Sequence, residues 1–245
     1  MRSFIFILVV LSSSSYSHGA QACSGEVKVL LSPETVETVI TSLKVGKESG
    51  GRVYFFDTEK LELLKRGLIV RVRQGANNDL TIKVRVPGED KTVDTNLRQH
   101  FPCEVNRTEG GDDTEYSVRS KYKVLPVPDA GRDVASVLTQ MQKKLLRDAG
   151  ISIDWGRVKR VANVKVTKWE APAQSPFGKL TLEMWEWPKG NILELSTKIA
   201  SDAGPSKYAE FQRFVDVKGL SLSPNQGAKT SIVLETLTNQ THPLR

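Results

Sequence analysis

Short runs in which apolar and polar residues alternate occur along much of the chain. Strict alternation is typical of a β-strand with one buried face, because successive side chains point to opposite sides. Strands are therefore predicted at residues 26–29, 69–73, 82–86 and 163–167, and at 179–187 and 192–196 around the turn Pro188-Lys189-Gly190-Asn191. Residues 109–115, rich in glycine and acid, indicate a solvated loop instead.

Helical segments interrupt this strand pattern. Ser32, Pro33 and Glu34 supply a cap, a first-turn proline and a first-turn acid for a helix that reaches about Lys44. Further helices are predicted from Thr58 to Gly67, at 132–149, and within 206–237. Because strands of one type flank the long helix on both sides, we expect a single α+β domain over residues 23–245, with its core at about 25–199.

The charged residues of the predicted strands share one face. Arg71 and Arg73 lie opposite Val70 and Val72, and Lys83 and Arg85 form the same pattern ten residues later. The simplest interpretation is an antiparallel sheet with a solvated face. However, four cations on neighbouring strands repel one another unless an anion lies between them. The alternative is a closed barrel with a polar, charged lumen, wet and charge-compensated, and with helices packed outside.

Composition and charge narrow the chemistry. The 245 residues include 35 Lys and Arg against 28 Asp and Glu, a net charge of +7. Such an excess favours an anionic partner. Only two cysteines and three histidines leave little room for a His/Cys zinc site or a triad built on histidine.

The first 22 residues have the three parts of a secretory signal peptide. Arg2 is the positive start, residues 4–11 are an apolar run, and Ala20-Gln21-Ala22 is a small-residue cleavage site. The run is too short for the ~20 residues of a membrane span, so no transmembrane segment is predicted. Cleavage near Ala22 removes one positive charge, which leaves +6. We expect a secreted or periplasmic protein.

Cleavage would make Cys23 the first residue of the mature chain. Two fates are open to it: lipidation, for which Ala20 is a poor match, or a disulfide with Cys103, which an oxidising compartment favours.

An ordered set of motifs resembles the CYTH family, also called triphosphate tunnel metalloenzymes. The motifs are Tyr54-Phe55-Phe56-Asp57-Thr58, Leu64-Lys65-Arg66-Gly67-Leu68, Arg71-Val72-Arg73, Thr81-Ile82-Lys83-Val84-Arg85, Lys159-Arg160, and the acidic hairpin Leu180-Thr181-Leu182-Glu183 to Leu193-Glu194-Leu195. The resemblance implies an eight-stranded antiparallel β-barrel, the triphosphate tunnel, with helices outside. It also implies a triphosphate bound by lumen cations, and Mg²⁺ or Mn²⁺ held by lumen carboxylates.

The resemblance assigns a role to each matching residue. Substrate binding falls to Lys28, Arg71, Arg73, Lys83, Arg85, Lys159 and Arg160; metal binding falls to Glu26, Glu183 and Glu194; catalysis falls to Glu26 and Lys28. Two positions depart from the family pattern, because Ser24 and Ser196 stand where the opening ExExK and closing ExE motifs have carboxylates. The binding half of the site is complete, and the catalytic half is partial.

Three functions are consistent with these residues. The first is a secreted, metal-dependent phosphohydrolase that acts on a triphosphate or polyphosphate compound. The second is a non-catalytic binding module for a phosphorylated or polyanionic ligand, and the third is an interaction protein whose charged face is simply solvated. The proposed tunnel would hold seven cations and three carboxylates, most of the net charge. We therefore expect a small phosphorylated partner and no nucleic acid.

Overall fold

A computed structural model describes residues 22–46, 48–76, 78–86, 91–123, 127–128, 130–174, 176–200, 203–204 and 206–239. The predicted signal peptide, apart from Ala22, lies outside the described residues.

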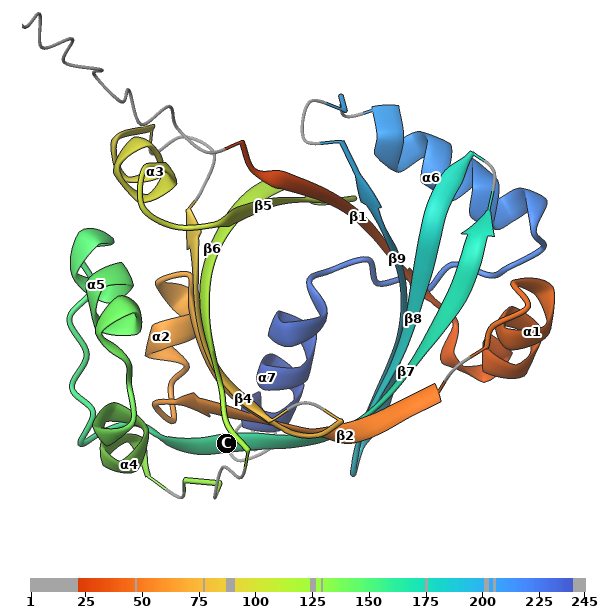
Figure 1. Ribbon diagram of the computed structural model, residues 1–245. Helices are drawn as coiled ribbons and strands as arrows, with labels where there is room; N and C mark the ends of the chain where they lie inside the picture. Colours follow the sequence, from red (N-terminus) through yellow and green to blue (C-terminus); the bar gives the residue numbers. More distant parts are fainter. Residues whose placement is uncertain are drawn as a thin grey trace, which may run out of the picture.

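Within these described residues, nine strands close into a single barrel (Figure 1). They are β1 (Ser24–Leu31), β2 (Glu48–Asp57), β3 (Leu68–Gly75), β4 (Asp79–Val86), β5 (Cys103–Thr108), β6 (Gly111–Lys121), β7 (Lys159–Gln174), β8 (Phe177–Trp187) and β9 (Gly190–Ile199). Around the barrel the order is β1-β5-β6-β4-β3-β2-β7-β8-β9. The predicted α+β barrel is confirmed. The prediction of eight antiparallel strands was wrong, because the described residues form nine strands and β1 pairs with β5 in parallel, with Glu26 opposite Asn106.

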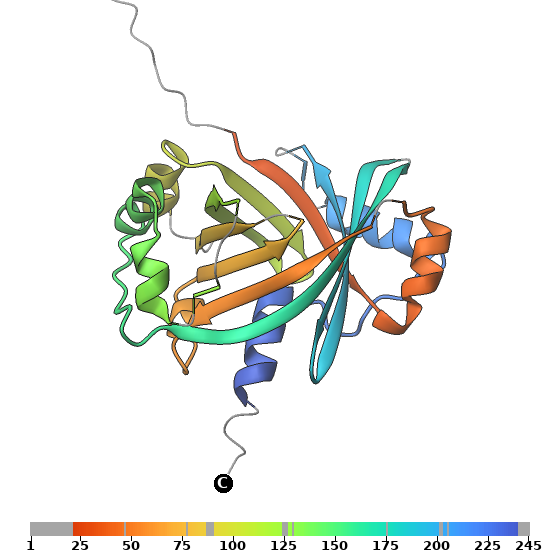
Figure 2. The same ribbon diagram turned by 60° about the horizontal axis from the view of Figure 1, so that its bottom comes forward.

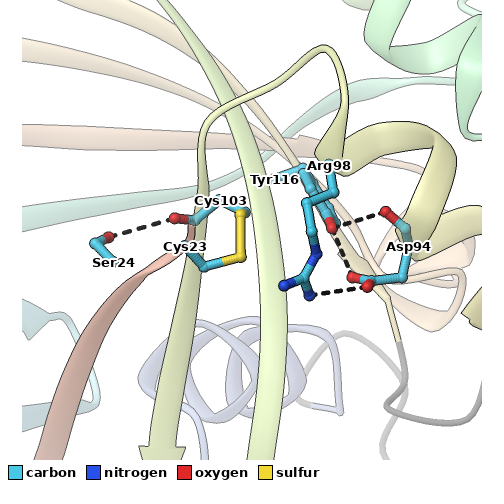
Figure 3. Close-up of a disulfide and its surroundings, with 6 residues drawn as sticks. All are labelled: Cys23, Ser24, Asp94, Arg98, Cys103 and Tyr116. Carbon is cyan, nitrogen blue, oxygen red and sulfur yellow. Dashed lines mark hydrogen bonds and ion pairs between the residues drawn. A yellow bond between two sulfur atoms is a disulfide. The ribbon is translucent and has the colours of Figure 1, made fainter. Parts of the chain in front are cut away.

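A disulfide explains how the two parallel strands come together (Figure 3). Cys23 and Cys103 are 80 residues apart in sequence, and their Cα atoms are 4.7 Å apart. Cys23 immediately precedes β1 and Cys103 is the first residue of β5, so the bond joins the two starts and the strands then run the same way. The Ser24 hydroxyl donates to the Cys103 carbonyl oxygen at 3.3 Å. The disulfide prediction is confirmed, and its bond occupies the sulfur that lipidation would use.

The helices are short, and all but the one at Lys91–Arg98, which was not predicted, overlap the predicted segments. They are α1 (Val36–Ser42), preceded by a 3₁₀ turn at Pro33–Thr35, α2 (Glu62–Lys65), α3 (Lys91–Arg98), α4 (Gly131–Ser136), α5 (Gln140–Asp148), α6 (Ser206–Val217) and α7 (Lys229–Asn239). The long helix predicted at 132–149 is split in two. Thr139 caps the second part: its hydroxyl accepts from the Gln142 backbone N–H at 3.3 Å, and its own N–H donates to the Gln142 side chain at 2.9 Å.

Two apolar cores lie between the outside of the barrel and its helices. The first packs α3, α4 and α5 against the outer faces of β2 to β6 and contains Phe56, Leu80 and Leu145. The second packs α1 and α6 against β1, β8 and β9 and contains Phe211 and Phe214. The apolar residues of the alternating strands therefore face outward, which leaves the charged residues facing the lumen.

The last helix, α7, does not lie outside the barrel as predicted. In Figure 1 it stands within the ring of strands, and in Figure 2 it emerges from the lower end. Its Val233 and Leu234 are buried against Val53, Phe55 and Trp185, which face the lumen. One end of the lumen is thus filled by a third apolar core. Across the described residues, no helix is long and apolar enough to cross a membrane.

Candidate functional site: the charged lumen

The open part of the lumen is a cavity of about 340 Å³, within the range of roughly 300–1,000 Å³ common for small-molecule sites. Nine cations line it: Lys28, Arg71, Arg73, Lys83, Arg85, Arg119, Lys168, Lys198 and Lys229. Six carboxylates accompany them: Glu26, Glu104, Asp113, Glu115, Glu183 and Glu194. The lining therefore has a net formal charge of +3, a charged lumen of the kind the alternating strands predicted.

The turn between β2 and β3 sets the position of the lumen cations. Asp57 ends β2, and its buried carboxylate accepts the backbone N–H groups of Leu63 and Leu64, both at 2.9 Å, which holds α2 in place. Gly67 then turns the chain at a φ of +72°, a conformation that glycine adopts without steric cost. Its carbonyl oxygen accepts the backbone N–H of Arg85 at 2.8 Å, which fixes β4 beside β3.

The first charged group is the cationic wall, which we define as Arg71 and Arg73 of β3 with Lys83 and Arg85 of β4. Three of these four have carboxylate partners. Arg73 Nε lies 3.0 Å from Asp79 Oδ2, Lys83 is paired with Glu115, and Arg85 Nε lies 3.4 Å from the other Glu115 oxygen. Glu115 is buried; burial alone would raise its pKa, but the charges of Lys83 and Arg85 lower it to about 2.

Arg71 is the exception in the cationic wall. Its buried Nε has no hydrogen-bond partner in the part of the chain that the structure describes. Burial and the neighbouring charge of Arg73 lower the pKa of Arg71 to about 10. Burial and the charge of Arg71 likewise lower the pKa of Lys83 to about 8. A bound anion would relieve both effects, because it would supply the missing negative charge.

The second charged group surrounds Glu26 of β1 and Glu104 of β5. Lys28 Nζ lies 2.9 Å from Glu26 and 3.7 Å from Glu104, and Lys198 contacts both carboxylates, at 3.3 Å from Glu26. Burial would raise the pKa of Glu26, but Lys28, a hydrogen bond with Glu104 and Lys198 lower it to about 2. Burial and the charge of Glu26 raise the pKa of Glu104. The two neighbouring carboxyl groups are therefore unequal, and Glu104 is the better proton acceptor.

The third charged group is the acidic wall, which we define as Glu183 of β8 and Glu194 of β9. The two residues are directly opposite each other in the sheet. Lys229, the first residue of α7, lies between them: its Nζ is 2.7 Å from Glu194 Oε1 and also contacts Glu183 Oε2. Burial would raise the pKa of Glu183, but Lys229 lowers it to about 2. Burial would lower the pKa of Lys229, yet the two carboxylates raise it.

Eight of the residues named from the sequence line this one cavity: Glu26, Lys28, Arg71, Arg73, Lys83, Arg85, Glu183 and Glu194. The structure does not bring Lys159 and Arg160 together with them. Both are exposed at the start of β7. Lys159 is paired with Glu59, and the Arg160 guanidinium lies 5.8 Å from the centre of the Tyr54 ring.

Sequence reasoning missed several lining residues, above all Glu104, Glu115, Lys198 and Lys229. Glu115 belongs to β6, which begins at Gly111, so the solvated loop predicted at 109–115 was wrong from Gly111 onward. The alternation of Asp113, Glu115 and Ser117 toward the lumen was the available signal. Lys229 had no such signal, because it enters the lumen from a helix that follows the barrel strands in the sequence.

The predicted metal ligands do not fit a metal centre. Glu26 is opposite Lys198, whereas Glu194 is opposite Leu30, four residues further along β1. At ~3.3 Å per residue, this separates the two levels by about 13 Å. Over the described ranges, no group of three or more His, Cys, Asp or Glu side chains could hold a metal ion. Each acidic pair already contacts at least one lysine ammonium group.

Comparison with solved structures places this barrel among known folds. A putative adenylyl cyclase from Hippeastrum, described as having a dominant triphosphatase activity, is 15% identical over 86% of this chain and 95% of its own, with a TM-score of 0.58. A putative adenylate cyclase from Bacillus halodurans is 18% identical over 86% of this chain and 98% of its own, with a TM-score of 0.54. The chain has a CYTH-like fold.

The similarity is one of structure. No protein-family model matches the chain, and no curated protein matches it in sequence. At these identities the two CYTH-like neighbours establish the fold, while the chemistry of this lumen follows from its own residues.

Proposed function

We propose that the lumen binds the phosphate chain of a small triphosphate or polyphosphate compound. The observation that carries this proposal is Arg71, whose buried guanidinium has an Nε without a partner among the described residues, in a cavity with a net charge of +3. Guanidinium and ammonium groups are the donors that suit phosphate oxygens, and a guanidinium can bind two oxygens at once.

The arrangement of the cationic wall favours a chain of phosphates over a single one. In the register of β3 and β4, Arg73 is level with Asp79, Arg71 with Thr81, and Lys83 with Ile69. Arg73, Arg71, Lys83 and Arg85 therefore occupy four successive levels, each two residues from the next. A ligand with several charged groups in a row can use all of these levels, whereas one phosphate can use only a part of them.

Calorimetry with inorganic triphosphate, in the presence of EDTA, tests this binding. We expect Arg71→Gln to weaken affinity by about 10- to 100-fold, the usual contribution of hydrogen bonds to a charged group. Arg52→Gln is the matched control, because Arg52 lies on the neighbouring strand β2 and donates to Asn163 Oδ1 at 3.1 Å away from the cavity. Equal affinity in both variants, or no binding by the unaltered protein, would contradict the proposal.

The second candidate is hydrolysis of a phosphoric anhydride bond. It is favoured by the triphosphatase activity described for the Hippeastrum neighbour. The resemblance implies Mg²⁺ or Mn²⁺ as cofactor, but the carboxylates of this lumen do not fit a metal centre, so we derive no step through one. Among the chain's own residues, Glu104 is a better candidate than Glu26 to orient an attacking water, since the pKa of Glu104 is raised and that of Glu26 is lowered to about 2.

Phosphate release from inorganic triphosphate and ATP, measured with Mn²⁺ and with EDTA, tests the second candidate. If hydrolysis occurs by this route, Glu104→Gln should abolish it, whereas Glu26→Gln should retain a larger part. If neither compound releases phosphate under either condition, hydrolysis is excluded and the binding function alone is left.

We also propose that the protein works outside the cytoplasm. The predicted signal peptide supports this location, and so does the Cys23–Cys103 disulfide, since disulfides persist in oxidising compartments. Mass spectrometry of the mature protein should find Cys23 at its amino terminus, without a lipid. An intact Met1 would contradict this part of the proposal.

A further inference from the structure

We infer that Lys229 supplies, from within the chain, the positive charge that a divalent metal would otherwise supply at Glu183 and Glu194. The lumen therefore binds its phosphate chain without a divalent metal. This inference rests on the proposed function, and it concerns the acidic wall rather than the cationic wall.

The contacts of Lys229 have the features of a counter-ion site. Glu183 and Glu194 face each other across neighbouring strands, where two like charges repel. The Lys229 ammonium group contacts one oxygen of each, at 2.7 Å for Glu194. The three side chains are only 15%, 21% and 9% exposed for Lys229, Glu183 and Glu194, so solvent screens these charges little.

Lys229 is also held in this position from several sides. Its Nζ lies 4.5 Å from the centre of the Trp185 ring, and Trp185 Nε1 donates to Glu183 at 3.2 Å. Before the helix, the Gln226 side chain donates to the Leu30 carbonyl oxygen at 2.7 Å and accepts the Leu30 N–H at 2.9 Å. These bonds fix the start of α7 to β1. The ammonium group of Lys229 is therefore held at a fixed position inside the barrel.

The same arrangement opposes a metal ion at this wall. A divalent cation that bound both carboxylates would have to displace a buried ammonium group. Behind Lys229 the helix packs through Val233 and Leu234 into the apolar core. An ammonium group moved toward that core would lose its partners without gaining water, which is costly. The Lys229 ammonium group therefore occupies the position between Glu183 and Glu194 where a metal ion would bind, and so excludes the metal.

Titration of Mn²⁺ alone, followed by calorimetry or by the electron paramagnetic resonance of free Mn²⁺, tests the inference directly. We expect Lys229→Ala to bind Mn²⁺ at least about tenfold more tightly than the unaltered protein, because two neighbouring carboxylates then lose the ammonium group that contacts both. The second substitution Glu194→Gln should remove the gain. Lys207→Ala is the matched control, since Lys207 also lies in the first turn of a helix and pairs with a glutamate, Glu210, outside the cavity.

Two further measurements keep the test decisive if Lys229→Ala does not fold. Lys229→Arg keeps the charge and should bind Mn²⁺ no better than the unaltered protein. The unaltered protein should bind inorganic triphosphate equally well in EDTA and in Mn²⁺. Binding that requires Mn²⁺, or tight Mn²⁺ binding by the unaltered protein at the acidic wall, would overturn the inference. Failure to bind triphosphate in either condition would instead overturn the proposed function, while the Mn²⁺ titrations would still decide the role of Lys229.

Discussion

The cationic and acidic walls of the lumen are built alike, but their charges are compensated differently. Each places like charges on two neighbouring strands, β3 and β4 for the cations and β8 and β9 for the carboxylates. On the acidic wall an internal cation, Lys229, contacts both carboxylates. On the cationic wall Glu115 and Asp79 balance part of the charge, and Arg71 Nε has no partner among the described residues. The difference supports the proposal that the lumen binds an anion rather than a metal cation.

The largest effect on stability should follow from removing the charge of Glu115, which pairs with two residues of the cationic wall. Glu115 is 4% exposed and contacts both Lys83 and Arg85. Because Glu115→Gln would leave the half-buried Lys83 without its carboxylate partner and Arg85 with only Asp113 at 3.8 Å, we expect the free energy of unfolding to fall by about 3 kcal/mol in urea denaturation.

The pH dependence of this loss follows from the pKa of Glu115, which is lowered from 4.5 to about 2. A carboxyl group with a lowered pKa stabilises the folded state above its unfolded value and loses that contribution as the pH falls. The stability difference between the unaltered protein and Glu115→Gln should therefore be full above pH 4.5 and shrink toward pH 2. A difference that does not depend on pH would contradict the assigned role.

A smaller effect, on the affinity for the ligand, should appear when Lys83 loses its proton. Its pKa of about 8 lies below the ordinary lysine value because of burial and the charge of Arg71. A phosphate chain binds the protonated form better, so affinity for inorganic triphosphate should be highest below pH 8 and should fall above it, by at most about tenfold per pH unit. Lys83→Gln measured over the same range corrects for titration of the ligand itself. If both profiles coincide, Lys83 does not contact the ligand.

Much of the barrel could be predicted from local patterns. Alternation is a property of each strand alone, so the segments around Arg71 and Lys83 indicated both the strands and the shared charged face. The disulfide followed from having only two cysteines in a chain that is predicted to be exported. The additional strand and the parallel pairing of β1 with β5 depend on how distant segments meet, and no local pattern contains that information.

The counter-ions of the site were harder to predict for the same physical reason. Glu115 pairs with Lys83 across neighbouring strands, and Lys229 reaches Glu194 from 35 residues away. The family resemblance gave three possible metal ligands, Glu26, Glu183 and Glu194. The strand register, however, separates Glu26 from Glu194, and Lys229 of α7 is paired with both Glu183 and Glu194. A carboxylate in a sequence motif therefore indicates a metal site only if no lysine or arginine of the same chain forms an ion pair with it.

The smallest effect on stability should come from a substitution in the acidic wall. This substitution tests whether the folded state requires both carboxylate partners of Lys229. Glu183→Gln leaves Glu194 at 2.7 Å from the ammonium group and keeps an amide oxygen that can accept from Trp185 Nε1. It also removes the repulsion between two opposed carboxylates. The pKa of Glu183, lowered to about 2, means that its charge stabilises the folded state, but Lys229 keeps Glu194 as a partner. We therefore expect the free energy of unfolding in urea to fall by ~1–2 kcal/mol, less than for Glu115→Gln. A loss as large as that of Glu115→Gln would mean that the two walls are balanced alike and that the acidic wall has no charge to spare.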